Sequence, residues 1–318
     1  MVPIQWKVSP VIDAHSHFRG EQPFTHYLGS HTIAGHTHAV ILASSGFKFF
    51  NEFKEGQACR FYVFGGLTHE KNKMAAGDGR YLGPQVAHLI AEGYHGIKMM
   101  DGAPYYKQKK ILPHPLDHEY YRPFWDAAEE HAMPITMHLA DPADHWKDDS
   151  KREIYKDADP QEEYFRQAEA VLDAHPNLRI NFAHFMFMGP QYDRLGRLFE
   201  KYPELRVDLA MGHEYLYYLS DNIKSARAFF IKWQDRILYG TDIFEGNSTA
   251  LARTKADQVR MFLEYDGTFS SPYMAEMGRP NDPGPNGRIK LEGLNLPLDA
   301  LQKIVGGNTS KWLSEIRR

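Results

Sequence analysis

Histidine and aspartate residues recur at the ends of short apolar segments, where their side chains could bind a metal ion. His15 and His17 follow VIDA, His138 lies in PITMHLA, His184 lies in INFAHF, and Asp242 ends ILYGTD. Imidazole nitrogens and a carboxylate oxygen are the ligands of Zn²⁺, Mn²⁺, Fe²⁺ or Ni²⁺. A cation held with one open position can lower the pKa of a bound water to about 7, which provides a nucleophile for hydrolysis.

A second His-x-His pair, His36 and His38, is expected to be structural. Side chains two residues apart on a strand point to the same face. His15 and His17 lie at the carboxyl end of their apolar segment, whereas the second pair precedes AVILA, at the amino end of its segment. In a barrel of parallel strands the site lies at the carboxyl ends. We therefore predict ligands at His15 and His17, and surface or helix packing for the other pair.

The remaining candidates gain weight from their common position. A single histidine after a strand is more often structural, and Asp242 alone could be a helix N-cap. Independent coincidence becomes a poor explanation when four histidines and one aspartate all lie at the same end of their strands. Gly240 would allow the tight turn that brings the Asp242 carboxylate to a central cation.

Eight buried-strand candidates, separated by helical patterns, predict a closed (β/α)8 TIM barrel in a single domain over residues 1–318. The apolar segments are 11–14, 39–43, 61–67, 96–100, 134–140, 181–186, 205–210 and 237–242. The predicted helices are 47–57, 80–92, 119–131, 160–174, 189–201, 214–232 and 252–265.

Three segments fall outside this repeat. Residues 102–118 and 140–159 follow strands, so we expect them over the carboxyl-terminal mouth as lids or substrate-contacting loops, or else as solvated surface loops. The Gly/Pro-rich segment 266–290 could be an arm that contacts another subunit or simply an ordered tail.

The composition excludes several partners and compartments. Thirty-seven basic and 41 acidic side chains give a formal charge of -4 without a basic stripe, which argues against nucleic acid as a partner. No signal peptide or membrane-spanning apolar run is evident, and the single Cys59 cannot form an internal disulfide. We expect a cytoplasmic protein with a small-molecule substrate and no membrane partner. The long insertions leave a homodimer open.

The ordered motifs resemble those of the amidohydrolase superfamily. They are V-I-D-A-H-S-H, H-G-I-K, I-T-M-H, N-F-A-H and Y-G-T-D. The terminal I-V-G-G-N-T-S-K-W-L at 304–313 is similar to the closing motif of the amidohydrolase-related family, which includes aminocarboxymuconate-semialdehyde decarboxylase, aromatic acid decarboxylases and lactone hydrolases. The resemblance covers residues 11–313 and does not specify a substrate.

This resemblance implies a role for each strand-end residue. His15, His17, His138 and Asp242 would bind one divalent transition metal, with Zn²⁺ expected first and Mn²⁺ as the alternative. His184 would be the catalytic acid/base, and Asp242 would also take a proton from the attacking water.

Four further residues are predicted to bind substrate. Arg19 lies two residues beyond the His-x-His pair and could hold a substrate carboxylate, although a surface salt bridge is equally plausible. Lys98 could contact substrate, pack structurally or, when carboxylated, bridge two metals as in some superfamily members; we favour one metal. His213 and Tyr105 complete the set. Other candidates for the pocket lining are Asp141, His145, Trp146 and Glu214.

The residue types favour hydrolysis of an ester, lactone or amide in a small anionic molecule. Metal-dependent, non-oxidative decarboxylation of an aromatic or unsaturated acid is the alternative, because the same ligands serve both reactions. A barrel that has lost activity and acts as a scaffold ranks last, since all five ligand and acid/base positions hold competent residues.

Overall fold

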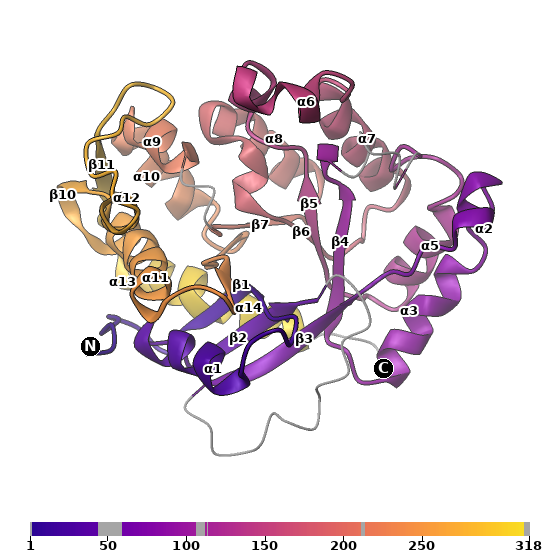
Figure 1. The fold of residues 1–318 in the computed structure, drawn as a ribbon, viewed down its shortest axis with the longest axis horizontal. Coiled ribbons are helices and arrows are strands. Elements are labelled where there is room, and N and C mark those ends of the chain that lie inside the picture. The colour runs from indigo at the N-terminus through magenta and orange to yellow at the C-terminus, as the bar shows by residue number, and fades with distance from the viewer. Residues whose placement is uncertain (1, 44–58, 106–111, 113, 211–213, 315–318) are drawn as a thin grey trace.

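Nine parallel strands form one curled sheet in the computed structural model, which describes residues 2–43, 59–105, 112, 114–210 and 214–314 (Figure 1). The strand order is β8-β7-β6-β5-β4-β3-β2-β1-β9. The strands are β1 (Ile12–His17), β2 (His38–Leu42), β3 (Arg60–Gly66), β4 (Gly96–Gly102), β5 (Ile135–Leu139), β6 (Ile180–Phe182), β7 (Arg206–Asp208), β8 (Ile237–Leu238) and β9 (Ile243–Phe244). Most residues of β1, β2, β4 and β5 are buried whichever way their side chains point, which suits a sheet that is covered on both faces.

The predicted eighth strand is interrupted, and its two halves close the barrel. β8 pairs with β7, and β9 pairs with β1. Between them, Ala14 N–H donates to the Tyr239 carbonyl and Asp242 N–H donates to the His15 carbonyl, both at 2.8 Å. The first and last strands are therefore joined, and the predicted (β/α)8 barrel is confirmed.

Helices follow most strands and surround the sheet (Figure 1). The main ones are α1 (Phe24–Ile33), α3 (Leu82–Ala91), α5 (Arg122–Glu130), α7 (Gln161–Ala174), α8 (Tyr192–Lys201), α9 (Glu214–Ser220), α10 (Ile223–Lys232) and α11 (Thr249–Glu264), with the short α2 (Lys71–Ala75), α13 (Leu298–Gln302) and α14 (Asn308–Ser314). Among the described helices, none is long and apolar enough to cross a membrane.

Two helix predictions need correction. The single helix predicted over 214–232 is two helices, because the Asn222 side chain accepts a hydrogen bond from Ser225 N–H and starts α10 afresh. Helix α1 was not predicted, since its sequence FTHYLGSHTI mixes glycine, histidine and hydroxyl residues with few apolar ones. The helix predicted over 47–57 lies outside the described residues.

The two later insertions are ordered. Residues 140–159 contain 3₁₀ turns at Ala143–Trp146 and Asp149–Lys151 and the short α6 (Arg152–Tyr155), which lies beyond the carboxyl ends of β4 and β5 in Figure 1. In the segment predicted at 266–290, β10 (Asp266–Ser270) and α12 (Pro272–Glu276) are followed by β11 (Lys290–Leu294), which pairs antiparallel with β10. Glu292 N–H donates to Ser220 Oγ at 3.0 Å, so this arm packs on α9.

The terminal Gly-Gly-Asn sequence fixes the start of β8. Asn308 Nδ2 donates to the carbonyls of Gln234 and Ile237, at 2.6 and 2.8 Å. Gly306 lies against the Pro10 carbonyl, which would be 2.1 Å from any added Cβ. The close approach of the two backbones therefore requires glycine, and the motif has a structural role in joining the chain ends to the barrel.

Replacing Gly306 tests this role. We expect Gly306→Ala to lower the free energy of unfolding by about 1–3 kcal/mol, because an added methyl must displace backbone rather than a flexible side chain. Gly29→Ala is the control: Gly29 lies within α1 with open space at its Cβ, and alanine there should stabilise by about 0.5–1 kcal/mol. Urea denaturation measures both; equal effects would contradict this account.

Candidate metal centre

Three side chains converge at the carboxyl ends of β1 and β8. His17 Nε2 lies 3.1 Å from Asp242 Oδ1, and His15 Nε2 lies 3.5 Å from the same oxygen. The two Nε2 atoms are 3.2 Å apart. Ligand atoms about 2.0–2.2 Å from a common cation have such separations. The three atoms therefore have the spacing of metal ligands.

Hydrogen bonds fix which nitrogen of each ring faces the others. His15 Nδ1 lies 2.9 Å from Asp208 Oδ2, and His17 Nδ1 lies 3.1 Å from the Leu42 carbonyl oxygen. An ionised carboxylate and a carbonyl can only accept, so both rings carry their proton on Nδ1. Both Nε2 lone pairs are then directed toward Asp242, as metal ligation requires.

His138 and His184 lie beside this group with the same kind of orientation. The ring centres of His138 and His184 are 5.1 Å apart, and those of His15 and His184 are 5.0 Å apart. His138 Nε2 lies 3.1 Å from Asp141 Oδ1, so Nδ1 keeps its lone pair. His184 Nδ1 is 3.4 Å from the Ala210 carbonyl oxygen, which leaves Nε2 as the acceptor. Each of the four rings thus donates one N–H and retains one lone pair.

The backbone adopts left-handed conformations just beyond the carboxyl ends of the strands that carry these residues. The φ angles are 59° at Ala140, 57° at His184 and 58° at Asp242, and Phe185 to Phe187 are also positive. Positive φ angles are energetically unfavourable for non-glycine residues, and residues with such angles concentrate at functional sites. This run explains why β6 ends at Phe182 although INFAHF predicted a longer strand.

Asp208 is a buried carboxylate that the sequence reasoning missed. It accepts hydrogen bonds from His15 Nδ1, Asn181 Nδ2 and the backbone N–H groups of His184 and Ala210, at 2.7–3.0 Å. Burial opposes its ionisation, but the contact with His15 and the hydrogen bond from Asn181 help to outweigh burial, and the Asp208 pKa lies below its ordinary value. Its signal in the sequence is an aspartate within the apolar LRVDLA.

Burial favours the neutral form of His17 and His184, whereas Asp242 stays ionised. Burial lowers the pKa of His17 to about 4 and, together with repulsion from His15 and His138, that of His184 to about 3. Burial opposes ionisation of Asp242 as well, but the neighbouring His17, His15 and Lys255 together outweigh burial and hold its pKa below the ordinary value. Neutral imidazole and ionised carboxylate are the forms that bind cations.

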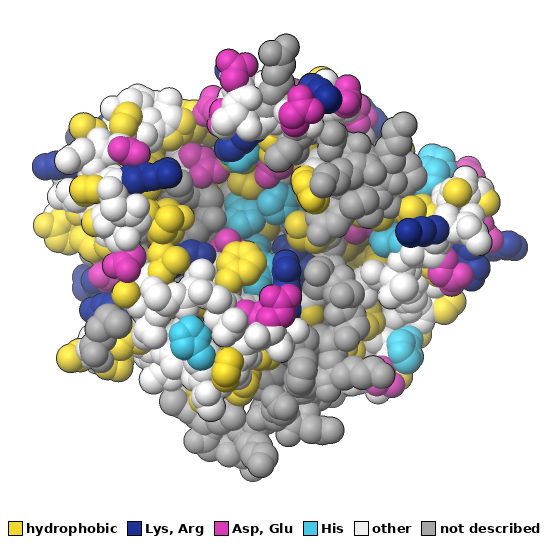
Figure 2. All heavy atoms as spheres, viewed as in Figure 1, with side chains coloured by type: hydrophobic (Ala, Val, Ile, Leu, Met, Phe, Trp, Pro, Cys, Tyr) yellow, Lys and Arg dark blue, Asp and Glu magenta, His cyan; other side chains and the backbone are white. Residues whose placement is uncertain are grey.

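The convergent residues border a cavity of about 230 Å³, and Figure 2 shows histidine side chains gathered in a hollow of the face viewed. Arg19 and Lys98 supply its cationic groups. Lys98 is 3% exposed, and burial lowers its pKa to about 8 despite the opposing charges of Asp208 and Asp242. The remaining lining is apolar or belongs to the candidate centre: His15, His17, Leu42, Met100, His138, His184, Asp242 and Phe244.

Glu245, also missed from the sequence, positions the segment that carries Arg19. Its carboxylate accepts the backbone N–H groups of Arg19, Gly20 and Glu21 at 3.0–3.1 Å. Within the described residues, the Arg19 guanidinium has no ion pair, so the surface salt bridge considered for it is absent there. Its charge is available to the cavity.

Other predicted pocket residues lie elsewhere or in the insertion. Tyr105 is 41% exposed and does not border the cavity, so its predicted contact with the site is not seen. His213 lies outside the described residues. Trp146 Nε1 donates to the Asp159 carbonyl, and His145 Nδ1 bonds to Tyr155 Oη at 3.1 Å, so both are engaged within 140–159. Burial raises the pKa of Glu214, at the start of α9, to about 7.

A second group, Asp13, His31 and His36, has ligand atoms close together but a different geometry. The Nδ1 atoms of His31 and His36 are 2.8 Å apart with ring centres 5.0 Å apart. For His15 and His17 the nearest ring nitrogens are farther apart, at 3.2 Å, although the ring centres are almost equally spaced, at 5.1 Å. The His31 and His36 rings therefore point their Nδ1 atoms at one another more directly, as in a hydrogen bond between the two rings. His36 is interior, and its Nε2 bonds to Tyr239 Oη at 2.8 Å.

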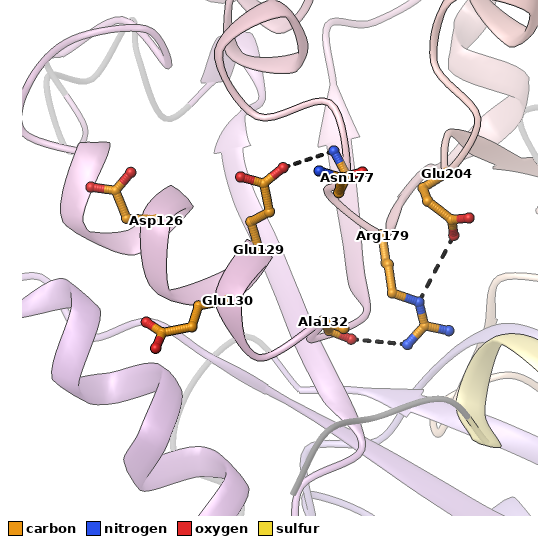
Figure 3. Close-up of a pocket in the computed structure, with 7 residues that line it drawn as sticks. All are labelled: Asp126, Glu129, Glu130, Ala132, Asn177, Arg179 and Glu204. Carbon is orange, nitrogen blue, oxygen red and sulfur yellow. Dashed lines mark hydrogen bonds and ion pairs between the residues drawn. The ribbon is translucent and has the colours of Figure 1, made fainter.

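A larger hollow of about 840 Å³ lies at the opposite end of the barrel, and its lining residues include some that precede β5, β6 and β7 (Figure 3). Asp126, Glu129, Glu130 and Glu204 border it, and Arg179 donates to the Ala132 carbonyl at 2.9 Å. This end of a barrel supports stability rather than chemistry. The smaller, histidine-lined cavity is therefore the candidate site.

Fold and site together define a (β/α)8 barrel with a histidine-rich centre at the carboxyl ends of its strands. A profile of the amidohydrolase family matches residues 102–314. The chain belongs to the amidohydrolase family, whose superfamily generally uses a divalent metal. A search of curated proteins found no significant match to the sequence.

Solved structures support the fold. An uncharacterized TIM-barrel protein from Bordetella bronchiseptica is 14% identical with a TM-score of 0.55, covering 96% of this chain and 98% of its own. A 4-oxalomesaconate hydratase from Rhodopseudomonas palustris is 12% identical (TM-score 0.57, 96% and 95% covered). A dihydroxybenzoic acid decarboxylase from Polaromonas sp. JS666, with bound manganese, is 12% identical (TM-score 0.55, 96% and 97% covered). At these identities the likeness concerns the fold alone.

Asp208→Asn tests the buried carboxylate. We expect it to weaken zinc binding about 10–100-fold, because His15 loses the acceptor that holds its proton on Nδ1. Glu264→Gln is a suitable control, since Glu264 is also buried but bonds to Lys7 N–H and Arg260 on the outer surface of the barrel. Competition with a chromophoric chelator measures both affinities. Unchanged affinity in Asp208→Asn would refute the role of this carboxylate.

Proposed function

We propose that the protein is a metal-dependent hydrolase of an ester, lactone or amide bond in a small anionic molecule. The observation that carries the proposal is the convergence of His15 Nε2, His17 Nε2 and Asp242 Oδ1 within 4.8 Å of one another, each imidazole being held by a hydrogen bond at its other nitrogen. Such preorganisation is costly unless the lone pairs have a common ligand.

The residues present fit one divalent transition metal. His15, His17 and Asp242 would hold it, with His138 Nδ1 as the fourth protein ligand. Imidazole and carboxylate ligands are compatible with Zn²⁺, our first candidate, and with Mn²⁺ as the alternative. When bound, the cation would supply Lewis acidity for the substrate carbonyl and lower the pKa of water.

His184 and Asp242 would manage the protons. With Nδ1–H directed to the Ala210 carbonyl, His184 Nε2 faces the cavity as a base, and its pKa of about 3 means that the resting ring is neutral. Asp242 remains ionised and can accept the proton of the attacking water. Transfer of that proton through His184 Nε2 to the leaving oxygen or nitrogen would complete the reaction, as the carbon–oxygen bond to water forms and the bond to the leaving group breaks.

Arg19 and Lys98 would select an anionic substrate. Both border the cavity, and an arginine can bind a carboxylate through two parallel hydrogen bonds. The volume of about 230 Å³ suits a small molecule, and the Phe244 ring, stacked on His17 with centres 4.5 Å apart, gives an apolar wall.

Decarboxylation is the second candidate, because the same cations could hold a reacting carboxylate beside the centre. In that reaction the bond between the carboxylate carbon and its neighbour breaks, and a protein acid must protonate the remaining carbon. A neutral His184 has no proton on Nε2 to donate, which favours hydrolysis. Release of carbon dioxide from aromatic acids, compared with ring opening of lactones, separates the two activities.

Elemental analysis tests the metal centre. We expect about one equivalent of a divalent transition metal per chain in the unchelated protein, and its loss from a His15→Ala/His17→Ala variant. His36→Asn is the control, because its ring belongs to the directly hydrogen-bonded pair and should leave the metal content unchanged.

Other stoichiometries would revise the proposal. Two equivalents would indicate that Lys98 is carboxylated and bridges two cations, against the single metal favoured here. No metal after reconstitution with zinc or manganese would refute the hydrolytic mechanism and favour a scaffold.

His184→Asn tests the acid/base role. We expect turnover to fall about 10²–10⁴-fold while bound metal stays near one equivalent, because the variant loses the proton acceptor but not the ligands. His175→Asn is a matched control: His175 is also buried but bonds to Glu129, remote from the cavity. Turnover and metal content are measured on the same preparations. A fully active His184→Asn would exclude this role.

A further inference from the structure

A chain of hydrogen bonds connects His138 with the insertion at 140–159. His138 Nε2 lies 3.1 Å from Asp141 Oδ1, Tyr155 Oη lies 2.7 Å from Asp141 Oδ2, and His145 Nδ1 lies 3.1 Å from Tyr155 Oη. The hydrogen bonds can all form at once, because Tyr155 Oη donates to the Asp141 carboxylate and can accept from His145. Asp141 is then the final acceptor from both His138 and Tyr155.

Asp141 is held firmly where β5 ends. It follows Ala140, whose φ is 59°, and its own carbonyl accepts a hydrogen bond from Gln161 Nε2 at 2.8 Å. Gln161 begins α7, so the start of the insertion is hydrogen-bonded to the helix that follows the insertion. The side chains of Asp141 and His138 are each 17% exposed.

This arrangement leaves His138 one nitrogen for a ligand. Because Asp141 accepts at Nε2, the Nδ1 atom carries the lone pair, whereas His15 and His17 present Nε2. An imidazole that binds a cation through one nitrogen becomes a stronger donor at the other. Metal at Nδ1 would therefore strengthen the bond to Asp141 and, through it, the bond from Tyr155.

We infer that Asp141 and Tyr155 are positioning residues that select Nδ1 of His138 as a metal ligand and couple occupation of the centre to the seating of residues 143–155 over the mouth. The inference rests on the metal centre proposed above. Because such coupling is reciprocal, interactions that stabilise the ordered insertion would raise the metal affinity, and bound metal would stabilise the ordered insertion.

The insertion itself supplies matched controls. Asp144 also belongs to it and accepts a hydrogen bond from Tyr218 Oη at 2.9 Å, yet within the described part of the chain neither residue has a hydrogen bond or ion pair with His138. Asp144→Ala and Tyr218→Phe therefore remove the same groups as Asp141→Ala and Tyr155→Phe, and disturb the same segment without disturbing His138.

The first measurement is ¹⁵N NMR of the histidine rings in the full chain without metal, which reports the protonated nitrogen directly. We expect His138 to be protonated at Nε2 in the wild type and in both control variants, and to become a mixture of tautomers in Asp141→Ala. Asp141→Asn, whose amide oxygen can still accept, should restore the wild-type tautomer. An Nδ1-protonated wild-type ring, or an unchanged tautomer in Asp141→Ala, would overturn the selection of Nδ1.

The second measurement is zinc affinity by chelator competition, with hydrogen exchange of residues 143–155 followed with and without zinc. We expect Asp141→Ala to weaken binding about 10–100-fold, with smaller losses in Asp141→Asn and Tyr155→Phe. Zinc should slow exchange of the insertion in the wild type and both controls but not in Asp141→Ala. Equal losses in the controls, or exchange indifferent to zinc in the wild type, would overturn the coupling.

The two proposals can fail separately. If the wild type binds no zinc, the proposed metal centre and the coupling fall together, while the NMR result still decides the orientation of His138. If zinc binds but Asp141→Ala retains full affinity, the centre stands and the positioning role falls.

Discussion

The candidate centre depends on the buried carboxylate of Asp208. An ionised group with no exposed surface is tolerated only when its oxygens are satisfied, and Asp208 accepts four hydrogen bonds from β1, β6 and the turns that follow β6 and β7. The same bonds orient His15 and fix the backbone of His184. One charge in the wall of the barrel therefore sets the protonation of one predicted ligand and the position of the predicted acid/base.

Strain at the mouth is offset by similar local networks. The left-handed Asp242 follows Thr241, whose N–H and hydroxyl both bond to Asp13, and Lys255 Nζ donates to the Asp242 carbonyl. Asp13 also accepts the His15 N–H at 3.0 Å. The break between β8 and β9 is thus tied to β1, which directs the Asp242 side chain toward the two histidines instead of letting the strand continue.

The charges around the cavity form a consistent pattern. Each of the four imidazoles has one nitrogen engaged by a hydrogen-bond acceptor, Asp242 stays ionised, and the cationic side chains of Arg19 and Lys98 lie at the cavity wall. A divalent cation would add positive charge to the site, which is the electrostatic basis for the anionic substrate proposed above. Leu42, Met100 and Phe244 add apolar surface to the wall of the same cavity.

The sequence by itself determined the barrel and the strand ends at which its candidate site residues lie. Apolar segments with regular spacing predicted the strands, and polar residues at their carboxyl ends predicted His15, His17, His138, His184 and Asp242 correctly as neighbours, since parallel strands bring equivalent ends together. Local patterns also located both later insertions, although they did not show that 140–159 reaches His138.

Only the tertiary structure decided how those residues are held. His15 bonds to Asp208, 193 residues away, and Arg19 N–H bonds to Glu245, 226 residues away. Such partners, the tautomers they impose and the left-handed run at 184–187 depend on which strand ends meet and on the space between them. Sequence periodicity reports burial and local geometry, whereas these hydrogen bonds arise only when the barrel closes.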